Sequence, residues 1–529
     1  MFAALATLHT WPMPSDPAHL TRLDNDDTAF NTWVIAWVAH QIRHHPLELF
    51  QAPIFFPARD ALAFSEHMLV PGLLGAPLQW AGLSPVLVYN LMVWAGLALS
   101  GFAMALVMRS WTASTAAAIV SGCLYAFNAH LLTRYSHLQA LHVQFFPLVL
   151  YAFDRVLRDT DTRAPRSARM AWLLGGAFVL QALCSNYTMV MMSLALVVAA
   201  TVRPELWRAR PRLWLTLGVT GAGVALVLLP FLLPYSRVRA EQGLVRTIDD
   251  VRIYSAGWTD YLATAGRLHY AWWSHRVFEG RTALFPGVLG VALALIAVAR
   301  GVAWTDLRAR MALAFGVAGL ALSFGASLPG YEWLQAHIPL FQGIRAAARW
   351  GFLFLIAIAI LSGYGVAILE QRLRAYFWWP ALAVALVGVV TLEALRAPIA
   401  MERYDGIPAV HGRLAREDVG AIVIFPLYGG RNFNLNAEYM LHQTRHWKPM
   451  LNAYSSFAPA GFYHLAERLQ SFPDVAALEA MRAQGFTHAL LHRTPLEHTF
   501  GAEAVDALRA HPGLELVFEE DGVILYRVR

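Results

Sequence analysis

The chain has 529 residues, of which 57% are hydrophobic and 14% are charged, and its mean hydropathy is +0.45. Soluble domains carry about 25% charged residues, so this composition excludes an ordinary soluble protein and predicts an integral membrane protein. The net charge of +6 comes almost wholly from arginine and indicates no nucleic-acid partner. Cys123 and Cys184 both lie in apolar runs, so no disulfide framework is predicted.

Apolar runs close to the length of a spanning helix, about 20 residues, recur along the first three quarters of the chain. They predict ten spanning helices, and residues 1–12 predict the end of one more. The run 170–202 is divided at CSNYT, where Asn186 and Tyr187 predict a turn. The predicted spans are 85–108, 112–130, 141–157, 170–187, 188–202, 213–234, 285–301, 311–328, 350–370 and 376–396.

The placement of the arginines predicts the orientation of these spans. If the loop 13–84 lies outside the membrane, the alternate short loops carry fifteen arginines between Arg109 and Arg374. Positively charged loops stay inside, so the loops 235–284 and 329–349 face outside. In bacteria this orientation places the protein in the inner membrane, with residues 1–397 as its transmembrane domain.

From residue 398 the composition changes, and residues 398–529 predict an extracytoplasmic α/β domain. GAIVIFPL, THALLH and LELVFEEDGVILYRV are typical of strands, the last of them a hairpin that turns at Asp521 and Gly522. YMLHQ, YHLAERLQ, VAALEAMRAQG and AEAVDALRAH are typical of helices. Gly485 is expected to end the third of these helices.

Three carboxylates, Asp24, Asp26 and Asp27, stand together in RLDNDDTAFNTW. Apolar residues at helical spacing follow them, and Trp33 and Trp37 suit a helix that lies in the membrane interface. One alternative is that Asp26 or Asp27 caps this helix. One aspartate suffices for a cap, however, and three carboxylates this close repel one another. The other alternative is therefore that they bind a cation or a substrate.

An extracytoplasmic DND after a first span, followed by amphipathic segments and a polytopic bundle, resembles the GT-C superfamily of membrane glycosyltransferases. That superfamily includes protein O-mannosyltransferases, aminoarabinose transferase and oligosaccharyltransferase. NTWVIAWVAHQI, IFFPARDALAFSEHMLVPGLLGAP, HLQALHVQFFPLVLYAFDR, YSAGWTDYL, LFPG, IRAAARWGFL and HWKPMLNAYSSF resemble a group of bacterial polytopic proteins described as glycosyltransferases. This resemblance covers nearly the whole chain.

The resemblance implies an α-helical polytopic fold of about 10–11 transmembrane helices with an extracytoplasmic α/β domain. It also implies that a sugar moves from a polyprenyl-phosphate-linked donor to a glycan, lipid or protein acceptor. A carboxylate of the first loop would take the proton of the acceptor hydroxyl, with Asp24 or Asp26 as the first candidate and Asp27 as the next. Carboxylate oxygens are also ligands that Mg²⁺ or Mn²⁺ prefers, which makes Asp24 and Asp26 candidate metal ligands.

A phosphate donor needs cationic partners, and arginine binds phosphate in a planar, bidentate geometry. Arg345 and Arg349 stand four residues apart, which predicts one helical face at the outer mouth of the span 350–370. The alternative for both is contact with lipid headgroups. The other candidates for donor binding, each open to the alternative of an ordinary interfacial hydrogen bond, are Arg134, His137, Glu66 and His67.

Two further segments on the outer side carry candidate residues. In the loop 235–284, Glu279 is a candidate second acid, together with Asp250 and Tyr254. In the tail, HQTRHWKPMLNAY is either a sugar-binding surface or the seam that docks the domain onto the bundle, and we favour the seam.

Two other classes of function compete with an enzyme. A secondary transporter is expected to place ionisable residues near the bilayer midplane, and a flippase for a lipid-linked sugar is expected to carry a hydrated, charged groove through the membrane. In this sequence Asp154, Glu370 and Glu393 lie near span ends, and the polar residues gather on one side. A non-enzymatic envelope assembly factor that uses its outer domain for binding stays open.

Overall fold

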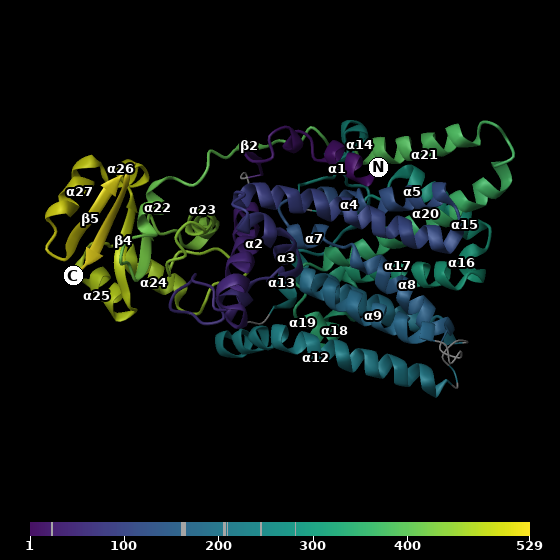
Figure 1. Ribbon diagram of the computed structural model, residues 1–529, viewed down its shortest axis with the longest axis horizontal. Helices are drawn as coiled ribbons and strands as arrows, with labels where there is room; N and C mark the ends of the chain where they lie inside the picture. The colour runs from purple at the N-terminus through teal and green to yellow at the C-terminus, as the bar shows by residue number, and fades with distance from the viewer. Residues whose placement is uncertain (23–24, 160–164, 205–207, 209, 244–245, 281) are drawn as a thin grey trace. The chain divides into compact units, whose positions relative to one another are not determined.

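The computed structural model describes residues 1–529 except 23–24, 160–164, 205–207, 209, 244–245 and 281 (Figure 1). The chain forms two compact units. The bundle unit comprises Met1–Ser15, Leu91–Pro230 and Val245–Ala400, and the sheet unit comprises Asp16–Asn90, Phe231–Leu244 and Met401–Arg529. The first loop and the tail therefore fold into one unit although more than 300 residues separate them.

Each predicted span contains a helix. α4 and α12 continue into the sheet unit. The helices that lie wholly or partly in the bundle unit are α1 (Phe2–His9), α4 (Pro85–Thr112), α5 (Thr115–Ala126), α6 (Ala129–Leu132), α7 (Leu138–Leu141), α8 (Phe145–Asp159), α9 (Pro165–Cys184), α10 (Asn186–Thr201), α12 (Pro211–Gln242), α13 (Ile248–Ile253), α14 (Arg267–Trp272), α15 (Val288–Ala299), α16 (Val302–Thr305), α17 (Leu307–Ser323), α18 (Tyr331–His337), α19 (Pro339–Gln342), α20 (Gly351–Leu373) and α21 (Trp379–Ala394).

The predicted membrane bundle is confirmed. Within the described part of the chain, four helical stretches are long and apolar enough to cross a membrane: Pro85–Thr112, Leu138–Arg158, Pro211–Gln242 and Ala347–Leu373. Shorter apolar helices accompany them, among them α5, α10, α15 and α21. The predicted division of the run 170–202 is also confirmed, because the Ser185 side chain accepts a hydrogen bond from the Thr188 N–H and caps α10.

Two buried acids near span ends have structural partners. Asp154 is fully buried, and its carboxylate accepts hydrogen bonds of 2.9 Å from Arg158, Arg203 and Arg308. Glu393 accepts hydrogen bonds from the first backbone N–H groups of α15. Both carboxylates are therefore held by groups that stabilise their charge. Such polar partners are expected for acids that lie near the ends of spans, as predicted.

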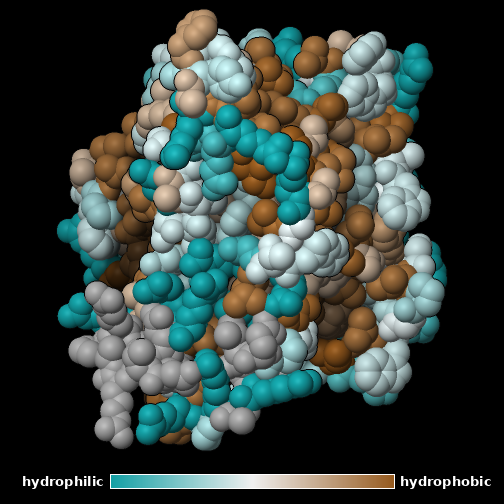
Figure 2. Space-filling view, turned by 90° about the vertical axis from the view of Figure 1, so that its right-hand side faces the viewer, coloured by the Kyte–Doolittle hydropathy of each residue, from teal (hydrophilic) through white to brown (hydrophobic). Residues whose placement is uncertain are grey.

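The three arginines around Asp154 come from loops that the sequence assigns to the inner side. Figure 2 shows the end of the bundle unit where these loops lie, and hydrophilic residues are interspersed with apolar ones on this face. Arg300 and Arg372, which the sequence also assigns to the inner side, are exposed. This distribution is what a bundle end next to lipid headgroups and water requires.

The sheet unit contains a four-stranded sheet in the order β3-β4-β6-β5, in which β3 and β4 are parallel and the other pairs antiparallel. The predicted hairpin is confirmed, because Asp521 and Gly522 have φ of +50° and +73° between β5 and β6, as a two-residue turn of this kind requires. The elements are β1 (Leu20–Thr21), α2 (Asp26–His44), α3 (Leu69–Trp80), β2 (Glu402–Arg403), α22 (Val410–Leu414), β3 (Ala421–Phe425), α23 (Asn436–Gln443), α24 (Phe462–Leu469), α25 (Val475–Ala483), β4 (Phe486–His492), α26 (Arg493–Phe500), α27 (Ala502–Ala507), β5 (Leu514–Glu520) and β6 (Val523–Val528).

Helix α2 differs from its prediction in its cap and in what covers its tryptophans. Its cap is Asn25, whose side chain accepts a hydrogen bond of 3.0 Å from the Asp27 N–H, so the prediction of Asp26 or Asp27 as the cap is wrong. The helix is also buried between α3 and α23, with Trp33 0% and Trp37 4% exposed. The two tryptophans therefore face protein and not lipid, so they give no support to the prediction that α2 lies in the membrane interface, and that prediction stays untested.

The tail segment HQTRHWKPMLNAY is a seam, and its partner within the sheet unit is α2. Gln443 accepts a hydrogen bond of 2.9 Å from the Trp33 indole and donates one to the Pro53 carbonyl oxygen. The Trp447 ring lies 5.5 Å from the Trp37 ring, measured between centroids. These buried contacts hold the tail against the first loop.

Helix α20 lies at the centre of the bundle unit and packs against α5, α15 and α17. A Cβ added at Gly365 would lie 2.1 Å from the Leu293 carbonyl oxygen. Because backbone rather than a flexible side chain occupies that space, α15 and α20 can approach this closely only with glycine at this position.

We expect Gly365→Ala to destabilise the bundle unit by about 1–3 kcal/mol, since the helices must separate to admit the methyl group. The matched control is Gly388→Ala in α21, where an added Cβ meets nothing within 4 Å. The measurement is thermal unfolding of the purified protein in detergent. Equal midpoints for the two variants would contradict this account of the α15–α20 contact.

Candidate active site

The first-loop aspartates are held by side chains of the tail. Asp26 Oδ2 accepts a hydrogen bond of 2.5 Å from Asn434 Nδ2, and Asp27 Oδ1 accepts one of 3.0 Å from the Tyr454 hydroxyl. Both carboxylates are half-buried at the first turn of α2. Asp24 lies outside the described residues. The tail thus fixes the orientation of two candidate carboxylates that the sequence places at the other end of the chain.

A third carboxylate, Glu438 of α23, lies close enough to Asp26 for their charges to interact. Its side chain reaches solvent, but neighbouring atoms desolvate it in part, and this desolvation, followed by the charge of Asp26, raises its pKa. Among the described residues no group of three or more His, Cys, Asp or Glu side chains could hold a metal ion. The assignment of Asp24 and Asp26 as ligands of Mg²⁺ or Mn²⁺ therefore stays a prediction.

In the bundle unit, the guanidinium groups of Arg345 and Arg349 each lie over a tyrosine ring. The guanidinium of Arg345 lies 4.7 Å from the ring centroid of Tyr254, and that of Arg349 lies 4.2 Å from the ring centroid of Tyr187. The backbone N–H of Arg345 also donates to the Tyr187 hydroxyl. The prediction that both arginines share one helical face is wrong, because Ala346 leaves the helical conformation between them (φ −94°, ψ +83°).

Neither guanidinium has an ion-pair or hydrogen-bond partner within the part of the chain that the structure describes. Both are half-buried and rest on aromatic faces, which supply cation–π attraction but accept none of their N–H groups. The donors of Arg345 and Arg349 are thus available to an anion.

Arg134, Arg246 and His137 lie within electrostatic range of this pair. Burial, and then the charges of Arg134, Arg349 and Arg345, hold the pKa of His137 well below its usual value, so its ring is neutral at pH 7. Burial, and then Arg345, lower the pKa of Arg246. The cluster is strongly cationic, and an anion bound to it would relieve the repulsion among its arginines.

The remaining candidates have different surroundings. His67 belongs to the sheet unit, is buried, and shares a hydrogen bond of 3.0 Å with the Tyr235 hydroxyl, while its neighbour Glu66 is half-buried. Asp250 caps α13 in a reciprocal arrangement with Thr247. Glu279 is exposed, and its charge acts on Asp260. The structure therefore gathers Arg345, Arg349, Arg134, His137 and Tyr254, with Asp250 beside them, and places Glu66 and His67 in the other unit.

Sequence reasoning missed Asn434, Tyr454 and Glu438 at the aspartates and Tyr187 and Arg246 at the arginines. The first three carry no local signal, because their role depends on the tail folding onto α2. Tyr187 and Arg246 could have been found, since the predicted turn at Asn186 and Tyr187 and the predicted loop 235–284 both fall on the same predicted side as Arg345.

The fold is similar to solved structures of membrane glycosyltransferases. The chain matches the oligosaccharyltransferase AglB of Archaeoglobus fulgidus in complex with an inhibitory peptide and a dolichol-phosphate, with a TM-score of 0.57 and 12% identity, over 100% of this chain and 73% of that chain. The Archaeoglobus fulgidus oligosaccharyltransferase in complex with Zn and sulfate gives 0.56 and 12%, over 96% and 68%. ArnT from Cupriavidus metallidurans in the apo state gives 0.50 and 13%, over 99% and 97%.

No protein-family model and no curated sequence matches the chain. The structural matches nevertheless extend over nearly all of it and establish a GT-C-like membrane fold with a C-terminal sheet region. The resemblance predicted from the sequence is thereby confirmed for the fold.

A separate cluster in the sheet unit consists of four histidines. The ring centroid of His411 lies 4.7 Å from that of His442, 5.7 Å from that of His446 and 6.5 Å from that of His492. Burial, and then the neighbouring histidines, lower the pKa of His411 to about 2, and burial first of all lowers that of His446 to about 3 and those of His442 and His492 to about 4.

Because these four histidines are neutral in the folded state, we predict that acid destabilises the sheet unit. In the unfolded chain the histidines bind protons below their pKa of 6.5, whereas the folded cluster stays neutral to about pH 4. The contribution of the cluster to the free energy of unfolding is therefore fully present above pH 6.5 and decreases as the pH falls toward 4. The loss amounts to about 1.4 kcal/mol per pH unit for each histidine in this window. We expect hydrogen exchange of α22 and α23 to accelerate between pH 7 and pH 5, after correction for the intrinsic rate.

His411→Phe keeps an aromatic ring and removes one titrating group, so it should flatten this pH dependence. His464→Gln is the matched control, because His464 is exposed. An unchanged pH dependence in the His411→Phe variant would contradict the role of the cluster.

Proposed function

We propose that this protein is an integral-membrane glycosyltransferase that moves a sugar from a polyprenyl-phosphate-linked donor to an extracytoplasmic glycan, lipid or protein acceptor. The observation that carries the proposal is the GT-C-like fold, which extends over 96–100% of the chain in matches to an oligosaccharyltransferase solved in complex with a dolichol-phosphate and, in another structure, with Zn and sulfate. We place the protein in a bacterial inner membrane, with residues 1–397 as the transmembrane domain and residues 398–529 on the extracytoplasmic side.

A first-loop carboxylate acts as the general base in the proposed reaction. As the acceptor oxygen bonds to the anomeric carbon of the sugar, its proton passes to the carboxylate, and the bond from that carbon to the phosphate oxygen breaks with its electron pair. Polyprenyl phosphate leaves. Asp26 and Asp27 are supported as bases because Asn434 and Tyr454 orient them and leave them half-buried, and Asp24 stays a third candidate.

Arg345 and Arg349 bind the donor phosphate in the proposed reaction and stabilise the charge that develops on the leaving group. Their half-buried guanidinium groups, which lie over the rings of Tyr254 and Tyr187, support this role. Arg134 adds positive charge, and the ring of His137, which is neutral, adds no further repulsion.

We expect Asn substitution of the catalytic aspartate to lower the rate of sugar transfer by about 10²–10⁴-fold, because Asn keeps the shape and removes the base. The variants are Asp24→Asn, Asp26→Asn and Asp27→Asn, made singly, and the measurement is transfer from a radiolabelled polyprenyl-phosphate sugar in membranes with matched protein levels. The control is Asp474→Asn, since Asp474 is exposed and its side chain makes no capping bond.

The same variants separate the competing functions. Full activity in all three would leave the envelope assembly factor as the better interpretation. A donor that accumulates on the inner leaflet instead of unmodified acceptor on the outer side would indicate a flippase. Loss of transfer on addition of a chelator, with recovery in Mg²⁺ or Mn²⁺, would support Asp24 and Asp26 as metal ligands.

We expect Arg345→Gln and Arg349→Gln each to raise the KM for the donor at least about tenfold, because each removes a charge-assisted hydrogen bond to phosphate. Arg372→Gln is the matched control, since Arg372 is exposed in a predicted inner loop. Rescue by lysine at either position would show that charge alone suffices, whereas failure of lysine would show that the bidentate geometry is needed. A donor KM unchanged in both glutamine variants would contradict the phosphate site.

A further inference from the structure

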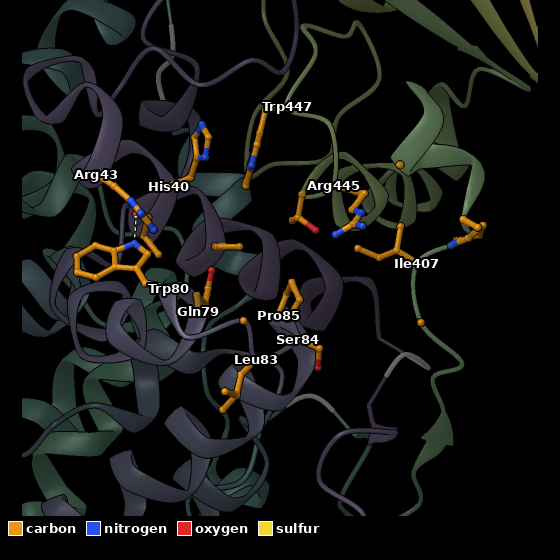
Figure 3. Close-up of a pocket in the computed structure, with 18 of the residues that line it drawn as sticks. His40, Arg43, Gln79, Trp80, Leu83, Ser84, Pro85, Ile407, Arg445 and Trp447 are labelled. Atoms are coloured by element: carbon orange, nitrogen blue, oxygen red, sulfur yellow. Dashed lines mark hydrogen bonds between the residues drawn. The ribbon is translucent and has the colours of Figure 1, made fainter. Parts of the chain in front are cut away.

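The sheet unit contains an open cavity of about 740 Å³ away from the candidate aspartates (Figure 3). Its walls come from α2, from α3 and the start of α4, and from the tail segment 404–447. Cavities of about 300–1,000 Å³ accommodate small molecules. In Figure 3, Arg43 and Trp80 lie on one side of the cavity and Arg445 and Ile407 on the other. The cavity is therefore wide enough to admit a sugar with a charged substituent.

All charged residues that line the cavity are basic. They are Arg43, Arg416 and Arg445, accompanied by His40 and His44, and no carboxylate is among the lining residues. Arg416 donates one hydrogen bond to the Gly412 carbonyl oxygen. Arg43 and Arg445 have neither an ion pair nor a hydrogen bond with any residue that the structure describes. Such a concentration of unpaired guanidinium groups attracts an anion.

Aromatic rings complete the walls. The Trp447 ring stacks on the His40 ring, with centroids 4.6 Å apart, and His40 stacks in turn on His44 at 4.2 Å. Trp447 has a φ of +53°, a left-handed conformation that costs a bulky residue about 1 kcal/mol or more. With this strained backbone, the Trp447 ring both contacts Trp37 of α2 and lines the cavity. A flat, partly apolar wall beside guanidinium groups suits a sugar ring with a negative substituent.

We propose that this cavity binds an anionic sugar, one that carries a phosphate or a carboxylate, with the charged group on Arg43 or Arg445 and the sugar ring against Trp447 or Trp80. The anion belongs either to a soluble sugar or to the headgroup of a lipid. The binding rests on the charge and shape of the cavity and does not depend on the transfer reaction proposed above.

Calorimetric titration of the full chain in phosphatidylcholine nanodiscs tests the proposal. Glucose 6-phosphate and glucuronate should bind, and glucose should bind at least about tenfold more weakly. At least one of Arg43→Gln and Arg445→Gln should reduce the affinity for glucose 6-phosphate about tenfold, the effect expected for one charge-assisted hydrogen bond, and the variant that does so identifies the side of the cavity that holds the charged group. Both side chains are exposed and unpaired in the described structure, so these variants should fold normally.

Arg482→Gln is the matched control, because Arg482 is an exposed arginine of the same unit that does not line the cavity. Nanodiscs that contain phosphatidic acid distinguish the two possible sources of the anion. If phosphatidic acid competes with glucose 6-phosphate, the site binds a lipid headgroup; if it does not compete, the site binds a soluble sugar. Glucose that binds as tightly as glucose 6-phosphate, or affinities that do not change in either cavity variant, would overturn the proposal. Because the readout is binding, this result is independent of sugar transfer.

Discussion

The contact between α2 and the tail is the interaction on which the sheet unit depends. Trp33 is fully buried, and its indole N–H is satisfied by Gln443, more than 400 residues later in the chain. A buried indole without this acceptor would lose a hydrogen bond in a poorly solvated place. The same contact brings Asn434 and Tyr454 to Asp26 and Asp27, so the packing that stabilises the unit also sets the geometry of its carboxylates.

The two candidate clusters carry charges of opposite sign, and each of them holds like charges close together. Asp26 and Glu438 are like charges close together, and hydrogen-bond donors such as Asn434 offset part of their repulsion. Arg345 and Arg349 are like charges that rest on tyrosine rings, which attract cations without neutralising them. Asp26, Arg345 and Arg349 are half-buried, and in such a position a charge interacts with a bound molecule more strongly than in water.

The sequence was sufficient for the bundle and for much of the tail, because long apolar runs and the Asp521-Gly522 turn are local signals. The structure bears out each predicted span as a helix and each predicted strand of the tail. The course of α2 could not be predicted in the same way, since Trp33 and Trp37 look alike whether lipid or protein covers them. The cap at Asn25 was missed because three neighbouring aspartates offered equally good oxygens.

The candidate site shows the same difference between features with a local signal in the sequence and features that depend on long-range contacts. Arg345 and Arg349 could be named from their residue type and their side of the membrane, but their tyrosine partners depend on how separate turns meet. Asn434, Glu438 and Tyr454 could not be named at all, because no spacing in the sequence connects them with Asp26 or Asp27. Long-range pairing of this kind is fixed by the fold and not by any local pattern.

The burial of Asp154 beneath three guanidinium groups has a consequence for biogenesis. One carboxylate shared by Arg158, Arg203 and Arg308 joins three helical segments that leave the translocon at different times. Without any one of these arginines, the buried carboxylate loses part of the charge stabilisation that offsets its removal from water. The network is therefore complete only when α17 has packed against α8, so the full set of partners of Asp154 requires correct assembly of this end of the bundle unit.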